Sequence, residues 1–197
     1  MAVIKPFRGY RPTQKKAAQV SSPPYDVMSS DEARKMVAGN PDSFLRIIKP
    51  EIDFSTGSEP ESNKLHRHGK LLLDSFINKG NLIQDEASAL YIYRVQMGDH
   101  IQTGVMAGAS VEEYNDGIIK KHEFTRPDKE NDRTNHIDNT NANTGPVFLI
   151  FRNNGEFQKL IEQMIASSPV ISLTAEDSTI HTLWIVRDPK QLFQLQN

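Results

Sequence analysis

The chain has 197 residues, of which 37% are hydrophobic and 24% charged, and its formal net charge is −2. This composition is typical of a globular protein with one domain or two small ones. The slightly negative charge gives no general attraction to nucleic acid, and the absence of cysteine excludes disulfides and thiolate metal sites. No apolar run approaches the roughly 20 residues that cross a bilayer, and the first residues lack the apolar core of a signal peptide. We therefore expect a cytoplasmic protein that binds neither a membrane nor nucleic acid.

The opening residues 3–13 predict an edge strand at most, because Pro6 and Pro12 each remove a backbone donor. Arg8 and Arg11 supply two guanidinium groups in this segment, and such groups suit the planar recognition of phosphate or carboxylate. Surface charge beside a strand is the competing interpretation. Both arginines are therefore candidate ligand-binding residues.

A Ser-Ser-Pro-Pro turn at residues 21–24 leads into the first predicted helix. Each proline fixes φ and disfavours helix in the residue before it, so Tyr25 and Asp26 follow a stiff backbone. One of the two serines at 29 and 30 would cap the helix, and Gly39 would end it. The pattern predicts either a ligand platform at a helix N-terminus or a purely structural turn.

The rest of the chain alternates strand and helix patterns. Strands are predicted over 43–51, 89–97, 101–111, 170–176 and 179–188, and helices over 61–78, 155–167 and from 189 onward. His66 and His68 are two residues apart on a helix and do not face each other, which favours solvated residues over a metal pair. These elements predict a single domain over residues 1–197 with an α+β fold, in which helices flank a mixed, largely antiparallel sheet.

Residues 118–151 combine a dense run of charges with two apolar ends. The apolar runs at 118–119 and 147–151 are predicted as buried strands. Between them, Thr125 would cap a helix over 126–138, with Pro127 in its first turn. The helical spacing would align Lys129, Asp132, Arg133 and His136 on one face.

Three interpretations of this segment compete. In the first, a phosphate-handling site is formed by His122, Glu123, Lys129, Asp132, Arg133 and His136. Asp132 would then contact His136 and prepare its imidazole for proton transfer. In the second, His122, Glu123 and Asp132 bind a divalent metal, but no HExxH or comparable spacing supports it. In the third, the charges form a solvent-exposed face of paired residues, as charge runs often do.

Six segments of the sequence occur in the same order in one known family. They are PFRGYRP, VSSPPYDVMSSDEA, SFLRIIKPEID, NLIQDEASALYIYRV, HEFTRPDKENDR and GPVFLIF, and they extend over essentially the whole chain. The PPYDV motif and the HE-x-T-x-x-x-K-E-x-D-R motif are specific. By these residues the chain resembles the family catalogued as domain of unknown function 1015, whose members are sometimes labelled ParB-like or associated with serine metabolism.

Members of that family are about twice as long, and their second half carries an Asp-Gly-His-His-Arg motif. The motif is similar to one in the phosphoryl-transfer site of free serine kinases with the ParB/sulfiredoxin fold. This chain contains no such motif, and its last predicted helix stops without a cap. The resemblance therefore implies an N-terminal half that shares a nucleotide-dependent phosphotransferase site with its own C-terminal half.

In that interpretation the ligand is a small molecule or a nucleotide, with ATP or ADP and Mg²⁺ as the cofactor. The candidate catalytic residues are His122, Glu123, Asp132, His136 and Asp26, and the candidate ligand-binding residues are Arg8, Arg11, Tyr25, Arg126, Lys129 and Arg133. Lys129 and Arg133 would hold phosphate groups, while Asp26 or Glu123 would orient an acceptor hydroxyl. The alternative function is a non-catalytic binding or scaffold domain for an acidic ligand or partner.

Overall fold

The computed structural model describes residues 2–122, 125–152 and 155–196. The chain forms two compact units. Unit 1 consists of Met1–Ala18, Ile83–Glu123 and Ile150–Asn197, and unit 2 consists of Gln19–Leu82 and Phe124–Leu149. The chain therefore leaves unit 1 and returns to it twice. Whether the two units fold together as the single expected domain stays a prediction.

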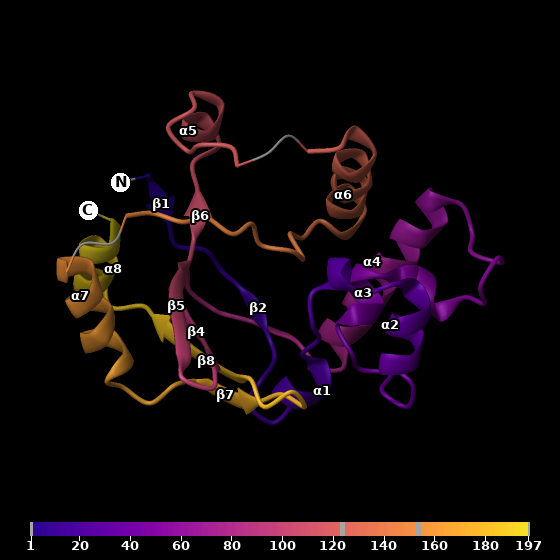
Figure 1. Cartoon of the computed structure of the whole chain (residues 1–197), viewed down its shortest axis with the longest axis horizontal. Coiled ribbons are helices and arrows are strands. Elements are labelled where there is room, and N and C mark those ends of the chain that lie inside the picture. The colour runs from indigo at the N-terminus through magenta and orange to yellow at the C-terminus, as the bar shows by residue number, and fades with distance from the viewer. Residues whose placement is uncertain (1, 123–124, 153–154, 197) are drawn as a thin grey trace. The chain divides into compact units, whose positions relative to one another are not determined.

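Unit 1 is built on a four-stranded antiparallel sheet with the order β5-β4-β8-β7 (Figure 1). Its strands are β4 (Leu90–Met97), β5 (His100–Met106), β7 (Ile171–Thr174) and β8 (Ile180–Val186). Gly98 makes the β4–β5 turn with a φ of +57°, a conformation that glycine adopts without strain. The strands predicted over 89–97, 101–111, 170–176 and 179–188 are confirmed, although the second is interrupted at Ala107.

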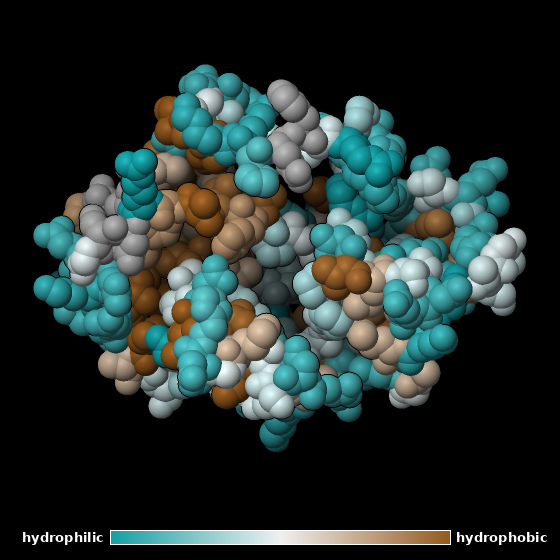
Figure 2. Space-filling view, in the orientation of Figure 1, coloured by the Kyte–Doolittle hydropathy of each residue, from teal (hydrophilic) through white to brown (hydrophobic). Residues whose placement is uncertain are grey.

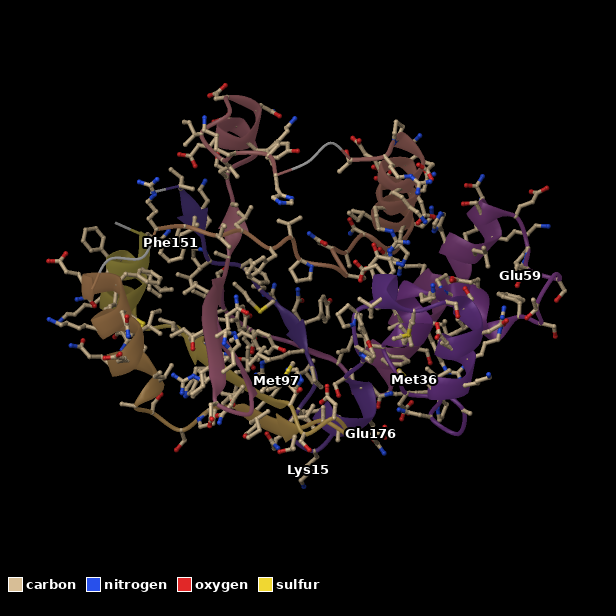
Figure 3. The ribbon with its side chains drawn as sticks, viewed as in Figure 1. Lys15, Met36, Glu59, Met97, Phe151 and Glu176 are labelled. Atoms are coloured by element: carbon tan, nitrogen blue, oxygen red, sulfur yellow. The ribbon has the colours of Figure 1, made fainter. Side chains whose placement is uncertain are left out.

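The core of unit 1 lies between this sheet and two helices, α7 (Gly155–Ile165) and α8 (Pro189–Gln196) (Figure 1). Leu90 and Ile92 of β4 and Trp184 of β8 point to the same face, because side chains alternate along a strand. Ile161 and Met164 of α7 cover them. Phe151, labelled in Figure 3, adds an edge-to-face contact with Phe157, with ring centroids 4.9 Å apart.

Short strands attach the N-terminal segment to unit 1. The strand β1 (Ile4–Lys5) pairs with β6 (Gly108–Ala109), and β2 (Tyr10–Arg11) pairs with β3 (Ile83–Gln84). The helix α5 (Val111–Asn115) follows β6 directly. These two-residue strands confirm that residues 3–13 form no more than edge pairings.

Unit 2 is helical. After α1 (Ala17–Val20), it contains η1 (Tyr25–Val27), α2 (Ser30–Met36), α3 (Leu45–Ile48), η2 (Pro50–Asp53), α4 (Ser62–Asn78) and α6 (Pro127–Thr140). Ser29, one of the two serines predicted as the cap, caps α2 and forms a reciprocal capping box with Glu32. The helices α4 and α6 pack against each other, and the rings of His66 on α4 and His136 on α6 meet between them.

Three predictions of local structure are wrong. Residues 43–51 form α3 and η2 in place of a strand, because Leu45 and Ile48 pack into one core cluster while Ile47 packs into another. The pattern of a short apolar run does not distinguish a strand from a buried helix. The apolar runs 118–119 and 147–151 form no strand in the described part of the chain, and the exposed fraction reaches 59% at Ile118 and 84% at Ile150. Apolar β-formers need a partner strand, and no pairing includes these residues.

The start of α6 also differs from the prediction. Arg126 occupies the N-cap position without a side-chain hydrogen bond, and Thr125 Oγ1 donates instead to Glu130 Oε2 at 3.0 Å. Pro127 is the first helical residue, as predicted. With these corrections, the helices and the antiparallel sheets confirm the α+β class. None of the described helices is long and apolar enough to cross a membrane.

Candidate functional site

A cleft of about 250 Å³ opens in unit 2 beside the helix α6. The C-terminal end of α3, the start of η2 and the first turns of α4 form its other sides. It is lined by Tyr25, Ile48, Lys49, Pro50, Glu51, Ser62, Leu65, His66, Lys129, Asp132 and Arg133. Four of these are residues that the sequence selects: Tyr25, Lys129, Asp132 and Arg133. We call this site the unit 2 cleft.

Three cations from two parts of the chain reach the unit 2 cleft. Lys49 forms an ion pair with Glu51 at 3.2 Å, and Arg133 forms one with Asp132 at 2.6 Å. In the parts of the chain that the structure describes, the Lys129 ammonium has neither a hydrogen bond nor an ion pair. The surface of α6 is largely hydrophilic (Figure 2). Among the described residues, the cleft therefore offers one cation without a partner and two that already have carboxylate partners.

Tyr25 fixes the direction of the Arg133 guanidinium. The guanidinium carbon lies 4.7 Å from the centre of the Tyr25 ring, within the range of a cation–π interaction. Tyr25 also packs against a buried cluster that includes Ala33, Leu45 and Ile52. The rigid Pro-Pro turn thus places an aromatic ring beneath a cation, and the prediction that Tyr25 belongs to the site gains a physical basis.

His66 and Lys49 are cleft residues that sequence reasoning missed, and His66 is the more informative of the two. It is 3% exposed, and its Nε2 lies 3.0 Å from Ser62 Oγ and 3.5 Å from Asp132 Oδ1. Its Nδ1 is buried without a hydrogen-bond partner in the described structure. A signal was present in the sequence, because His66 continues the buried stripe of Gly69, Leu73 and Phe76 on α4. The expectation of a solvated His66 is wrong.

His136 lies behind the cleft and is 1% exposed. Its Nε2 donates a hydrogen bond to the carbonyl oxygen of Ile47 at 3.0 Å, which tethers α6 to α3. Its ring meets His66 edge to face, with centroids 5.9 Å apart. Gly69 permits this close packing, since a Cβ there would lie 3.2 Å from the Ile47 oxygen. Burial lowers the pKa of His136, and the nearby Arg133 charge acts in the same direction.

Asp132 therefore faces a different histidine from the one predicted. Its carboxylate contacts His66 and Arg133. Both ring nitrogens of His136 have other partners, Nε2 the Ile47 carbonyl and Nδ1, more weakly, the Thr144 hydroxyl. The geometry makes His66 the imidazole that Asp132 can orient. His136 has the contacts of a residue that holds two helices together.

The other candidate residues that the structure describes lie outside the unit 2 cleft. Asp26 is exposed in η1, and Arg126 is exposed and pairs with Asp128 at 2.7 Å. His122 is exposed in unit 1, and Glu123 lies outside the described residues. Within the described ranges, no group of three potential ligands could hold a metal ion.

Arg8 and Arg11 both bind Asp85, a residue of unit 1. Arg11 donates to both oxygens of Asp85, from Nε at 3.1 Å and from Nη2 at 2.8 Å, and Arg8 Nε donates to the Asp85 carbonyl at 2.9 Å. The Tyr91 hydroxyl and Arg187 Nη2 also donate to the carboxylate, at 2.8 and 2.6 Å. We call this group the Asp85 hub.

The chemistry of the unit 2 cleft follows from these contacts. The cations can bind an oxyanion, and the Asp132–His66 pair can hold or move a proton beside it. Ile48, Pro50 and Leu65 give the cleft apolar walls, which suit the body of a small organic molecule.

No curated protein and no solved structure matches the chain. A family model does match, over residues 4–197, and its description is "Protein of unknown function (DUF1015)". This match includes both units and every residue of the unit 2 cleft. The chain therefore belongs to the family of unknown function DUF1015.

Proposed function

We propose that the unit 2 cleft binds the phosphate group of a small molecule and that the protein serves a phosphotransferase reaction. The observation that carries the proposal is the convergence of Lys49, Lys129 and Arg133 on one cleft, with Lys129 free of any described partner. A bound phosphate would accept charge-assisted hydrogen bonds from the Lys129 ammonium. Arg133, held by the Tyr25 ring, would supply the directional donors.

The size of the cleft favours a phosphate or a small phosphorylated molecule. Pockets that enclose drug-sized ligands have volumes of roughly 300–1,000 Å³, and the unit 2 cleft has about 250 Å³. A free-serine-kinase-like reaction, which the resemblance implies, would place the phosphorylated amino acid or one phosphate of a nucleotide here.

The residues fit a phosphate group better than they fit a complex of Mg²⁺ with ATP or ADP. Mg²⁺ in such sites is bound by one or two carboxylates together with substrate phosphates. Glu51 and Asp132 are the carboxylates of the cleft, and both already face cations. The cleft therefore does not fit a complex of Mg²⁺ with ATP or ADP.

One observation favours the alternative, a binding module without catalysis. Of the four candidate catalytic residues that the structure describes, only Asp132 lines the cleft. His66→Gln separates the two functions, because it removes the imidazole while it retains a polar side chain. A phosphotransferase would lose turnover in this variant, whereas a binding module would retain its ligand affinity.

Phosphate binding can be tested by titration of the chain with inorganic phosphate and with O-phosphoserine, followed by calorimetry and by NMR. Lys129→Gln and Arg133→Gln should each weaken binding about ten-fold or more, the usual effect of losing a hydrogen bond to a charged group. Arg126→Gln is the matched control, since Arg126 lies on the same helix but outside the cleft. Equal affinity in all four chains, or no binding by any of them, would refute the proposed site.

A further inference from the structure

The place that a phosphate would take on Arg133 is already occupied by the neighbouring residue. Asp132 Oδ2 accepts hydrogen bonds from both Nε and Nη2 of Arg133, at 3.1 and 2.6 Å. Side chains adjacent in sequence do not normally face each other on a helix. In the preferred fork arrangement, moreover, two separate oxygens accept the two donors. Here a single oxygen accepts both, so the pair is an imperfect version of the contact that a phosphate makes.

The two partners differ in how freely they can move. The Arg133 guanidinium rests on the Tyr25 ring, and its side chain is 32% exposed. The Asp132 side chain is 43% exposed and has a second potential partner, His66 Nε2, 3.5 Å from its Oδ1. A rotation of the carboxylate away from Arg133 and toward His66 needs no change in the core. Arg133 is therefore the fixed partner, and Asp132 is the exchangeable one.

We propose that Asp132 is an exchangeable counter-ion that makes the unit 2 cleft selective for dianionic phosphate. An arriving phosphate replaces the carboxylate on Arg133 and also binds Lys129, and the displaced carboxylate moves to His66. This inference rests on the proposed phosphate site and adds the way in which that site excludes other anions.

The selectivity follows from a competition between an internal and an external anion. A monoanion such as acetate carries no more charge than the Asp132 carboxylate, which is already tethered beside Arg133 and so competes at a high effective concentration. A dianion interacts more strongly with Arg133 and Lys129 together, and it can overcome this competition. Specificity would thus arise from a built-in competitor as well as from favourable contacts.

Asp132→Asn tests this proposal, because it removes the charge while it retains the shape of the side chain. At about pH 8, where phosphate groups are mainly dianionic, the variant should bind phosphate about three- to five-fold more tightly, given the usual strength of a partly exposed ion pair. Acetate, which should not bind the unmodified chain detectably, should bind the variant. Asp128→Asn is the matched control, since Asp128 pairs with Arg126 on the same helix away from the cleft, and it should change neither affinity.

A second readout follows the displaced carboxylate itself. Phosphate should shift the ring resonances of His66 in the unmodified chain, and the shift should be smaller in Asp132→Asn. Equal or weaker phosphate binding by this variant, when the unmodified chain binds phosphate, would show that Asp132 holds Arg133 in place for the ligand and would overturn this inference alone. Absence of phosphate binding by both chains would overturn the proposed function as well.

Discussion

The Asp85 hub of unit 1 and the Asp132–Arg133 pair of unit 2 use the same residue types for opposite purposes. The Asp85 side chain is 2% exposed and accepts hydrogen bonds from Arg11, Tyr91 and Arg187, which come from three separate segments. Asp132 is 43% exposed and shares its arginine with solvent and with an aromatic ring. The first carboxylate is saturated with donors, and the second is available for exchange.

The difference shows how burial decides between a structural and a ligand-binding ion pair. A buried charge is tolerated only when all its hydrogen-bonding capacity is used, and the hub meets this condition with donors that also attach the N-terminal segment to the sheet. A half-exposed pair has no such requirement and can change partners at little cost. Arg11 therefore belongs to the first type, and we propose that Arg133 belongs to the second.

The strongest test of this comparison is Asp85→Asn. The substitution leaves Arg11 partly buried without its counter-ion, so the free energy of unfolding should fall by about 3–5 kcal/mol. Trp184 is the only tryptophan of the chain and lies in the core of unit 1, so its fluorescence reports the unfolding of that unit. Asp132→Asn should leave the Trp184 transition unchanged. A loss of stability of similar size in both variants would refute the distinction.

Acid should affect the two units at different pH values. Burial alone would raise the pKa of Asp85, but the hydrogen bonds from Arg11 and Tyr91 and the charges of Arg11 and Arg187 hold it below its usual range. The stability from this carboxylate is thus complete above about pH 4, close to the unfolded value, and is lost as the pH falls through the folded pKa. The pKa of His136 is also lowered, chiefly by burial, so its contribution is complete above about pH 6.5 and declines below that value.

His136→Phe isolates the second of these effects. It fills the same space but leaves the Ile47 carbonyl without a donor, which should cost unit 2 about 1–3 kcal/mol. The decline in stability below about pH 6.5, the unfolded pKa of histidine, should disappear with the titrating group. Histidine ring resonances and amide exchange in unit 2 report the transition, while Trp184 reports unit 1. Phosphate binding should be compared at a temperature and pH at which both chains are folded. If the variant then binds phosphate far more weakly than the unmodified chain, His136 has a role in the site beyond packing.

Local patterns predict the regular elements of this chain well and the environment of single side chains poorly. The β4–β5 hairpin, the capping box at Ser29 and the C-terminal strands follow from alternation and turn chemistry, which act over a few residues. The helix α3 could not be predicted in this way, because two separate core clusters fix the conformation of Leu45 and Ile47.

The candidate site shows the same limit. The spacing on α6 places Lys129, Asp132 and Arg133 on one cleft, and the Pro-Pro turn places Tyr25 beside them. The contributions of Lys49 and His66 depend on how α3 and α4 pack against α6. Arg8 and Arg11 resemble ligand-binding residues in sequence. In the structure both bind the buried Asp85, far away along the chain: its carboxylate pairs with Arg11, and its backbone carbonyl accepts from Arg8.

The smallest expected effect concerns the ring that holds Arg133. Tyr25→Leu removes the cation–π contact while it retains an apolar side chain, and exposed contacts of this kind contribute about 0.5–1 kcal/mol. Phosphate affinity should therefore fall about two- to five-fold, because an unsupported guanidinium must be ordered by the ligand itself. Tyr25→Phe keeps the aromatic face and should bind as the unmodified chain does. If Tyr25→Phe weakens binding as much as Tyr25→Leu, the hydroxyl is the ligand contact, and Arg133 is held by Asp132 and not by the ring.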